Sequence, residues 1–264
     1  MTMVLIASAI NTIHAQELYI FSEPASNMAA KSIGVRVTNE GTFGSNPQVR
    51  TIPELMFGFH KNFMLHGQAF LSNMDGNYRL EGGSLYAKYR FYSADDLQKH
   101  FRMAAYGRVS TSKRPVYSED INLEGDNSGA QLGVVATELI HKLAISGHFA
   151  YSKAFDVEKR QLAGRPAPNE LLNYSLSAGY LLLPFTYKNY NQPNLNVYVE
   201  ALGKTNPATG HSYLDLAPAL QLIINSRTRI DLGYRFEVAG GMEGRYNKNM
   251  YLARVEFNFF NALR

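Results

Sequence analysis

The sequence predicts an all-β protein, a transmembrane antiparallel up-and-down β-barrel of about twelve strands. Three observations lead to this fold class. Segments of about ten residues alternate apolar with polar side chains between residues 32 and 260, which is the two-residue period of a strand. Tight connections alternate with longer ones along the chain, and the first fifteen residues have the character of an export signal.

Composition excludes several other classes of protein. The chain has 264 residues, a formal net charge of +4, and neither cysteine nor tryptophan, so disulfides, thiolate metal sites and a catalytic thiol are excluded. Lysine and arginine occur singly and form no basic run, and nucleic acid is therefore not an expected partner. The mean hydropathy of −0.22 is too polar for a bundle of membrane helices.

Residues 1–15 are expected to be a signal peptide. An apolar run ends at Ala15, a small residue that precedes the polar Gln16, and we expect cleavage between them. Nothing before His14 is charged, so we expect the basic start of the signal to lie upstream of Met1. A buried N-terminal strand is the alternative interpretation of the same residues.

Residues 16–31 form a periplasmic leader or plug between the expected cleavage site and the first strand. A lid or plug of the barrel and a leader that frays in the periplasm fit the sequence equally well. The barrel itself is expected to occupy residues 32–264.

The alternating segments define the expected strands. In residues 230–238 every even position is apolar or aromatic and every odd position is charged or glycine. Residues 249–260 repeat the pattern with an aromatic-rich face. An even number of segments of roughly 9–11 residues is typical of outer-membrane barrels. We expect strands at 32–38, 51–60, 64–73, 83–92, 100–111, 129–139, 142–153, 171–183, 194–204, 212–225, 228–238 and 249–260.

Connection lengths predict the orientation of the barrel. Outer-membrane barrels have short periplasmic turns and long external loops, so both termini are expected in the periplasm. The connections at 93–99 and 184–193 are longer than this rule predicts. The tight connections are 61–63, 140–141 and 226–228, and the longer ones are 39–50, 112–128, 154–170 and 239–248.

Aromatic residues cluster near the expected strand ends, where the aromatic belts of a membrane barrel lie. A soluble β-sandwich or lipocalin-like barrel would also alternate, but it would place its charges outside, and roughly 250 residues is long for such a domain. The aromatic residues concerned are Phe57, Phe59, Tyr89, Phe91, Tyr151, Tyr180, Phe236, Phe257 and Phe259.

The alternation also selects the charged side chains that line the lumen. Charges removed from water must be paired or hydrated, so cross-strand ladders are expected, above all Asp231, Arg235 and Glu237 against Arg254 and Glu256. The expected lumen-lining set is Arg36, Glu54, Lys88, Arg90, Arg102, Arg108, Glu200, Asp215, Arg229, Asp231, Arg235, Glu237, Arg254 and Glu256.

A basic wall is expected along two neighbouring strands. The segments at 83–92 and 100–111 carry four of these cations and no inward carboxylate of their own, and such a wall favours anions in a confined lumen. In the alternative, the loop that follows folds inward and neutralises the wall with Glu119, Asp120, Glu124 and Asp126.

No residues predict catalysis, a cofactor or a metal. Ser146 and His148 share a face, but strand neighbours two residues apart do not form a nucleophile–base pair, and no group that would orient the histidine is identifiable. His60 and His66 flank a short turn and would both face inward, but two imidazoles without a third ligand are more often polar lumen groups. We therefore expect no enzyme, with an outer-membrane phospholipase-like activity as a remote alternative.

The chain resembles outer-membrane β-barrel proteins of the Bacteroidota, an uncharacterised, transporter-like family. The resemblance rests on residues 15–19, 21–28, 100–105 and 124–129 and on the aromatic last strand. It implies contact with outer-membrane lipid and lipopolysaccharide, and recognition of the C-terminal strand by the barrel-assembly machinery. The last strand departs from the common pattern because four residues follow Phe260, so recognition would use an internal Phe259 or Phe260.

Two functions fit this fold. The first is a passive channel or porin for small polar, including anionic, solutes, with the lumen charges as selectivity elements. The second is a closed structural or accessory barrel of an envelope complex. Twelve strands enclose either a narrow pore or a filled interior, and the sequence does not distinguish between them.

Overall fold

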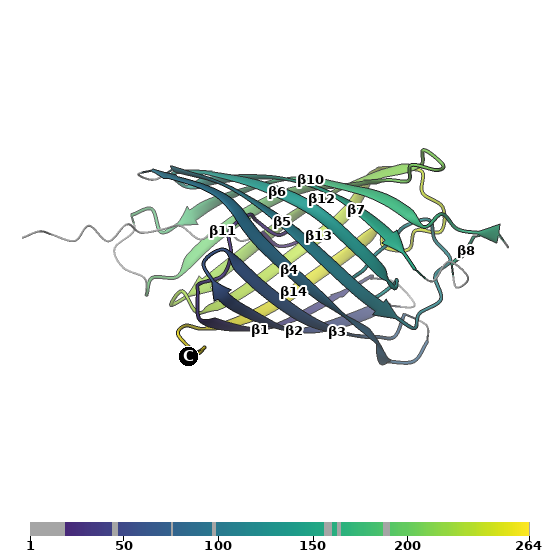
Figure 1. Ribbon diagram of the computed structural model, residues 1–264, viewed down its shortest axis with the longest axis horizontal. Coiled ribbons are helices and arrows are strands. Elements are labelled where there is room, and N and C mark those ends of the chain that lie inside the picture. The colour runs from purple at the N-terminus through teal and green to yellow at the C-terminus, as the bar shows by residue number, and fades with distance from the viewer. Residues whose placement is uncertain are drawn as a thin grey trace, which may run out of the picture.

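The protein is a closed antiparallel barrel of twelve strands, which confirms the predicted fold class (Figure 1). The computed structural model describes residues 19–43, 47–74, 76–96, 99–155, 160–162, 165–186 and 191–263. The expected signal peptide at 1–15 lies outside these residues. The described residues contain no helix long and apolar enough to cross a membrane.

Each predicted strand has a counterpart at nearly the same position. A further pair of short strands, β8 (Gln161–Leu162) and β9 (Arg165–Pro166), lies between β7 and β10 and forms a separate two-stranded sheet. The barrel strands are β1 (Ser32–Gly41), β2 (Val49–His60), β3 (Phe63–Ser72), β4 (Arg79–Asp96), β5 (Lys99–Ser112), β6 (Gly129–Ile140), β7 (Leu143–Ala154), β10 (Glu170–Leu183), β11 (Asn194–Thr205), β12 (Ser212–Ile224), β13 (Thr228–Gly240) and β14 (Asn249–Phe259).

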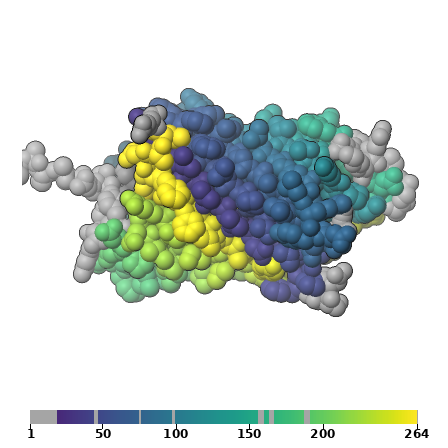
Figure 2. Space-filling model, turned by 90° about the horizontal axis from the view of Figure 1, so that it is seen from below, coloured from purple at the N-terminus to yellow at the C-terminus, as the bar shows by residue number. Residues whose placement is uncertain are grey.

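The barrel closes where the first strand pairs with the last. Strand β14 runs antiparallel to β1, with Val35 opposite Phe257 and Arg36 opposite Glu256. Figure 2 shows the yellow C-terminal strand lying directly against the purple β1 on the molecular surface. Closure pairs each of the twelve barrel strands on both sides, so the barrel sheet, as far as the structure describes it, has no free edge to recruit another strand.

The connections divide the barrel into two ends. Residues 61–62, 141–142 and 225–227 are short turns, and they share one end with the start of β1 and the last residues of β14. We call this the turn end and the opposite one the loop end, where residues 113–128 form a long connection between β5 and β6.

One predicted connection is mostly strand. The sequence predicts a break at 93–99, but β4 continues to Asp96 and β5 begins at Lys99. A register shift between Arg90 and Tyr92 interrupts the pairing of β4 with β5. Such a bulge adds a residue on one strand and ends the simple two-residue alternation, which explains why the pattern hid the end of β4.

The outer surface is a band of apolar side chains. Leu85, Leu132, Leu176, Leu220 and Leu232 are each at least half exposed, on five different strands. Aromatic rings pack beside one another near both ends of the barrel, with ring-centroid separations of 6.0 Å for Phe57–Phe59 and 6.3 Å for Tyr234–Phe236. This is the surface expected of a barrel that is solvated by lipid.

The exposed Leu176 provides a test of lipid contact. It lies near the midpoint of β10 and is 62% exposed. An arginine at a lipid-facing midplane position costs about 2–4 kcal/mol, so Leu176→Arg should lower the free energy of unfolding from lipid vesicles by that amount. Leu176→Ala is the control for loss of the side chain. Equal effects of the two substitutions, measured by denaturant titration, would show that this face is not in contact with lipid.

Candidate functional site in the barrel lumen

The structure places the fourteen predicted lumen residues on the inward positions of their strands. Eight are buried, namely Arg36, Glu54, Lys88, Glu200, Asp215, Arg229, Asp231 and Glu256. The other six, Arg90, Arg102, Arg108, Arg235, Glu237 and Arg254, are partly buried. Because these groups are removed from bulk water inside the barrel, their partners determine what the lumen can do.

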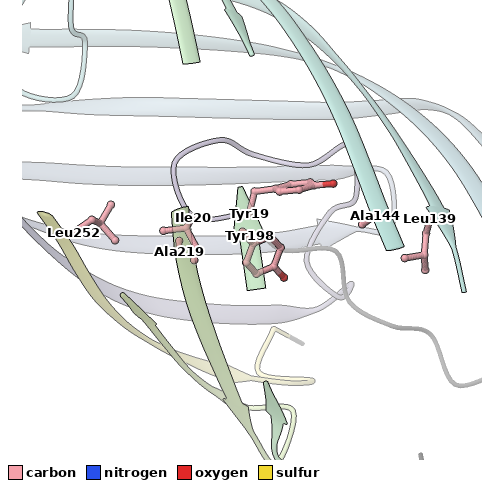
Figure 3. Close-up of a cluster of buried hydrophobic side chains, with 7 residues drawn as sticks. All are labelled: Tyr19, Ile20, Leu139, Ala144, Tyr198, Ala219 and Leu252. Atoms are coloured by element: carbon pink, nitrogen blue, oxygen red, sulfur yellow. The ribbon is translucent and has the colours of Figure 1, made fainter. Parts of the chain in front are cut away.

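The N-terminal segment, residues 19–31, occupies the lumen toward the turn end. Tyr19 and Ile20 are 2% and 1% exposed and belong to a buried cluster with side chains from β6, β7, β11, β12 and β14. Figure 3 shows these two residues surrounded by Leu139, Ala144, Tyr198, Ala219 and Leu252. The Tyr19 and Tyr198 rings meet edge to face, with their centroids 5.6 Å apart.

Glu200 on β11 anchors this segment. Its Oε1 accepts hydrogen bonds from the backbone N–H groups of Ile20 and Phe21, at 2.9 and 2.8 Å. Its Oε2 accepts from the hydroxyls of Ser22 and Ser177. A buried carboxylate is stabilised when several donors surround it, so Glu200 and the segment satisfy each other.

Basic side chains hold the rest of the segment. Lys88 Nζ donates to the carbonyls of Pro24 and Ser26 at 2.7 and 2.9 Å, and Arg102 donates to the Ser26 hydroxyl at 2.9 Å. Arg229 donates to the Tyr19 carbonyl at 2.9 Å. The segment thus uses lumen charges to satisfy backbone groups that have no strand partner.

An ion-pair network surrounds Arg36 at the seam between β1 and β14. The Arg36 guanidinium lies 3.3 Å from Glu23, 3.2 Å from Glu54 and 2.8 Å from Glu256. Glu256 also lies 3.5 Å from Arg229. The network joins four wall strands, β1, β2, β13 and β14, to the N-terminal segment, because Glu23 belongs to that segment.

The loop at 113–128 enters the lumen from the loop end. Asp126 forms ion pairs with Arg50 and Arg114 and accepts a hydrogen bond from the Tyr246 hydroxyl at 2.7 Å. Burial raises the pKa of the Asp126 carboxyl, but the two guanidinium groups outweigh it and lower the pKa to about 2. Asp120 of the same loop lies 2.8 Å from Lys204.

A chamber remains between the two insertions. It has a volume of about 210 Å³ and is bounded by residues 20–23 on one side and 121–124 on the other. Its charged lining consists of five cations and four carboxylates: Arg36, Arg108, Lys204, Arg235 and Arg254, with Glu23, Glu40, Glu54 and Glu124. The chamber is therefore polar and nearly balanced in charge.

The predicted basic wall has acidic partners. Glu23 lies 3.5 Å from Lys88, Asp95 lies 3.0 Å from Arg102, and Glu124 pairs with Arg108. Arg90 donates to the Asn62 side chain at 3.3 Å. The inward loop supplies Glu124, as expected if this loop neutralises the basic wall. The N-terminal segment supplies Glu23, and the extension of β4 supplies Asp95.

Part of the predicted ladder on β13 and β14 is wrong. Asp231 lies opposite Arg254, and Arg229 lies opposite Glu256, but Arg235 lies opposite Met250. Arg235 instead pairs with Asp215 on β12, and Glu237 pairs with Arg245 at 2.8 Å and Lys248 at 3.2 Å. Alternation predicts which face a residue occupies but not the register between strands.

Several charged residues of the lumen were not predicted, among them Arg50, Lys204 and Arg245. Arg50 is fully buried, although the predicted second strand began at residue 51. Lys204 is the last residue of the predicted strand at 194–204 and lies four positions after the inward-facing Glu200. The two-residue alternation therefore could have predicted that Lys204 faces inward. Arg245 lies between β13 and β14 and reaches Asp215 and Glu237, and the sequence pattern carried no signal for a loop residue of this kind.

The residues considered for catalysis and metal binding make separate contacts. Ser146 exchanges a hydrogen bond with Thr137 at 2.9 Å, whereas His148 Nε2 contacts the Tyr106 hydroxyl. His66 is buried and faces Met56 across the strands, but His60 is exposed after a register shift near the β2–β3 turn. The expectation that His60 and His66 share the inward face is therefore wrong.

Comparisons with known proteins support the fold. No family model matches the sequence, and no curated protein matches it. The solved structure of the NanC porin has a TM-score of 0.50 and 13% identity, covering 86% of this chain and 98% of that chain. A KdgM porin structure has a TM-score of 0.48 and 11% identity, covering 86% and 99%. Identities this low establish similarity of fold alone.

Substitution of Glu200 provides a test of how the N-terminal segment is held. Hydrogen bonds to charged groups contribute roughly 1.5–3 kcal/mol each, so Glu200→Gln should increase hydrogen exchange at the Ile20 and Phe21 amides by about tenfold or more. Glu138→Gln is the matched control, since Glu138 pairs with Lys99 and its side chain is 40% exposed. Unchanged protection in Glu200→Gln would contradict the anchoring role.

Proposed function

We propose that the chain is a channel of the bacterial outer membrane that passes small polar solutes, with the N-terminal segment as a displaceable plug. The observation that most directly supports this function is the polar chamber in the lumen. It lies between two insertions inside a barrel with an apolar outer surface. Similarity in fold to the NanC porin supports this function. The resemblance of residues 15–28 to Bacteroidota barrels supports export to that membrane.

The chamber favours polarity over charge as the basis of selection. Cations and carboxylates line it in nearly equal numbers, so we expect only a weak preference for anions. Screening by salt also confines the influence of each charge to roughly 8–10 Å at ordinary ionic strength. Arg102 and Arg108 remain the positions where a preference for anions would arise if their acidic partners moved away.

The plug is suited to displacement because polar contacts hold most of it. Glu200, Lys88 and Arg102 bind its backbone and hydroxyl groups. Water can replace such partners once the lumen is hydrated. The apolar contacts of the segment are spread along its length: Tyr19 and Ile20 belong to one buried cluster, Ala25 to a second, and Met28 packs against a third.

A disulfide lock tests the channel and its plug together. Ser22 Oγ lies 2.9 Å from Ser177 Oγ, and the chain has no cysteine of its own, so the Ser22→Cys/Ser177→Cys variant can form only the engineered bond. We expect conductance in planar bilayers to be suppressed in the oxidised protein and restored by a reductant. The Ser177→Cys single variant, which should respond to neither treatment, is the control.

A closed scaffold is the second candidate function, and the filled lumen favours it. If the oxidised protein, the reduced protein and a chain lacking residues 19–31 all fail to conduct, the scaffold is the better description. Equal conductance of the oxidised and reduced proteins would support the channel function but contradict the role of the N-terminal segment as a plug. In either case we propose a non-catalytic role, because Ser146 and His148 have different hydrogen-bond partners.

The proposed orientation places both termini in the periplasm. Thr209 at the loop end and Arg227 at the turn end are both exposed. Cysteine at position 209 should react with a membrane-impermeant maleimide on intact cells, whereas cysteine at position 227 should react only after the outer membrane is permeabilised. The reverse labelling pattern would invert the proposed orientation and place the termini outside the cell.

A further inference from the structure

Three methionines and one histidine meet at a small cavity between the N-terminal segment and the barrel wall. The cavity has a volume of about 40 Å³, and Met28, Met56, Met64 and His66 are among its lining residues. A space of this size accommodates one water-sized particle. Met28 belongs to the N-terminal segment, while the other three lie on β2 and β3.

Strand register explains why these side chains converge. Met56 on β2 lies directly opposite His66 on β3, and Met64 precedes His66 by two positions on the same strand. Residues two apart on a strand share a face, and directly opposed residues have Cβ atoms about 4.5–5.5 Å apart. Three of the four side chains are therefore neighbours on the inner wall.

Two glycines allow close packing at this cavity. Gly58 lies opposite Met64, and a Cβ built on Gly58 would lie 2.2 Å from the Ala29 carbonyl oxygen and 2.8 Å from Met28 Cγ. A Cβ built on Gly34 would lie 2.5 Å from Met56 Cε and 3.4 Å from Met28 Cε. The terminal methyl groups of Met28 and Met56 thus gather over one spot, and each is bonded directly to its sulfur atom.

The surroundings of His66 suit a metal ligand that binds through Nε2. Its Nδ1 lies 2.7 Å from Glu54 Oε1, while its Nε2 is buried without a hydrogen-bond partner. Glu54 also pairs with Arg36 at 3.2 Å, which favours the ionised carboxylate. Glu54 Oε1 and His66 Nε2 are both buried atoms without a hydrogen-bond partner. A carboxylate beside the ring nitrogen that faces away from the metal is common behind metal-binding histidines.

We propose that this cavity binds a soft monovalent cation of the Cu(I) type through the sulfur atoms of Met28, Met56 and Met64 and through His66 Nε2. Thioether sulfur selects Cu(I), and imidazole is also a copper ligand, whereas hard cations prefer oxygen. Arg36 also lines the cavity, but its three carboxylate partners compensate its charge. Among the described residues, no three His, Asp or Glu side chains form an alternative metal cluster.

A bound cation would join the N-terminal segment to the wall. Met28 contributes from the segment and the other ligands contribute from β2 and β3, so coordination would add a link beside those made by Glu200 and Lys88. Metal binding does not require that the barrel conducts solutes. It can therefore be measured on the purified protein independently of the proposed function.

The experiment is an anaerobic titration of the full chain in detergent with Cu(I), in competition with bathocuproine disulfonate, and with Ag(I) as a redox-inert probe. We expect one ion per chain, with sulfur and imidazole ligands in the X-ray absorption spectrum. Met56→Leu/Met64→Leu and His66→Gln should each weaken binding by at least about tenfold. Met242→Leu, a buried methionine in a different cluster, should leave binding unchanged.

Leucine conserves the approximate volume of methionine, so the barrel should fold in the leucine variants. Met28→Leu is a further safeguard because this residue lies outside the barrel strands. The proposal is overturned if the wild type binds no stoichiometric Cu(I) or Ag(I), or if Met28→Leu and the double variant retain full affinity. It is also overturned if Met242→Leu loses as much affinity as they do, or if Zn(II) binds equally tightly through the same residues.

Discussion

The ion pairs of Arg36 are the contact on which the interior of the barrel depends. Barrel closure brings β1 beside β14 and places Arg36 opposite Glu256 on one side and Glu54 on the other. A guanidinium removed from water is costly unless carboxylates surround it, and here the third carboxylate, Glu23, comes from the N-terminal segment. The same contact therefore stabilises the seam and positions the segment, so closure of the barrel and filling of the lumen are physically linked.

The two insertions satisfy different parts of the lumen. The N-terminal segment brings mainly backbone groups, which Glu200 and Lys88 bind. The loop at 113–128 brings carboxylates, which pair with Arg50 and Lys204 of the wall and with Arg114 of the loop itself. Each insertion thus supplies the partners that the wall near it lacks. What remains is a chamber of about 210 Å³ that both insertions line.

Period-two alternation was sufficient to predict the strands and the inward face, because an apolar outer surface and a charged lumen impose opposite chemistry on neighbouring residues. It failed where a second piece of information was needed. The bulge near Arg90 shifts the phase and hid the end of β4. The partner of Arg235 depends on register, and the role of Glu23 depends on a segment with no strand periodicity. The buried Arg50 was not predicted because the expected strand began one residue later, at residue 51. Alternation does not determine the exact residue at which a strand begins.

Gly34 and Gly58 allow the N-terminal segment and Met56 to pack closely against the wall at the methionine cavity. Glycine weakens a strand, and in a strand interior it often marks close approach by another part of the molecule. At Gly58 the approaching groups are the Ala29 carbonyl oxygen and Met28 Cγ, which lie 2.2 and 2.8 Å from a built Cβ. At Gly34 the approaching group is Met56 Cε, at 2.5 Å, with Met28 Cε in ordinary contact at 3.4 Å. The glycines bring a flexible thioether beside Met56, Met64 and the unpaired His66 Nε2, and that combination has a chemical use in soft-metal coordination which packing alone does not require.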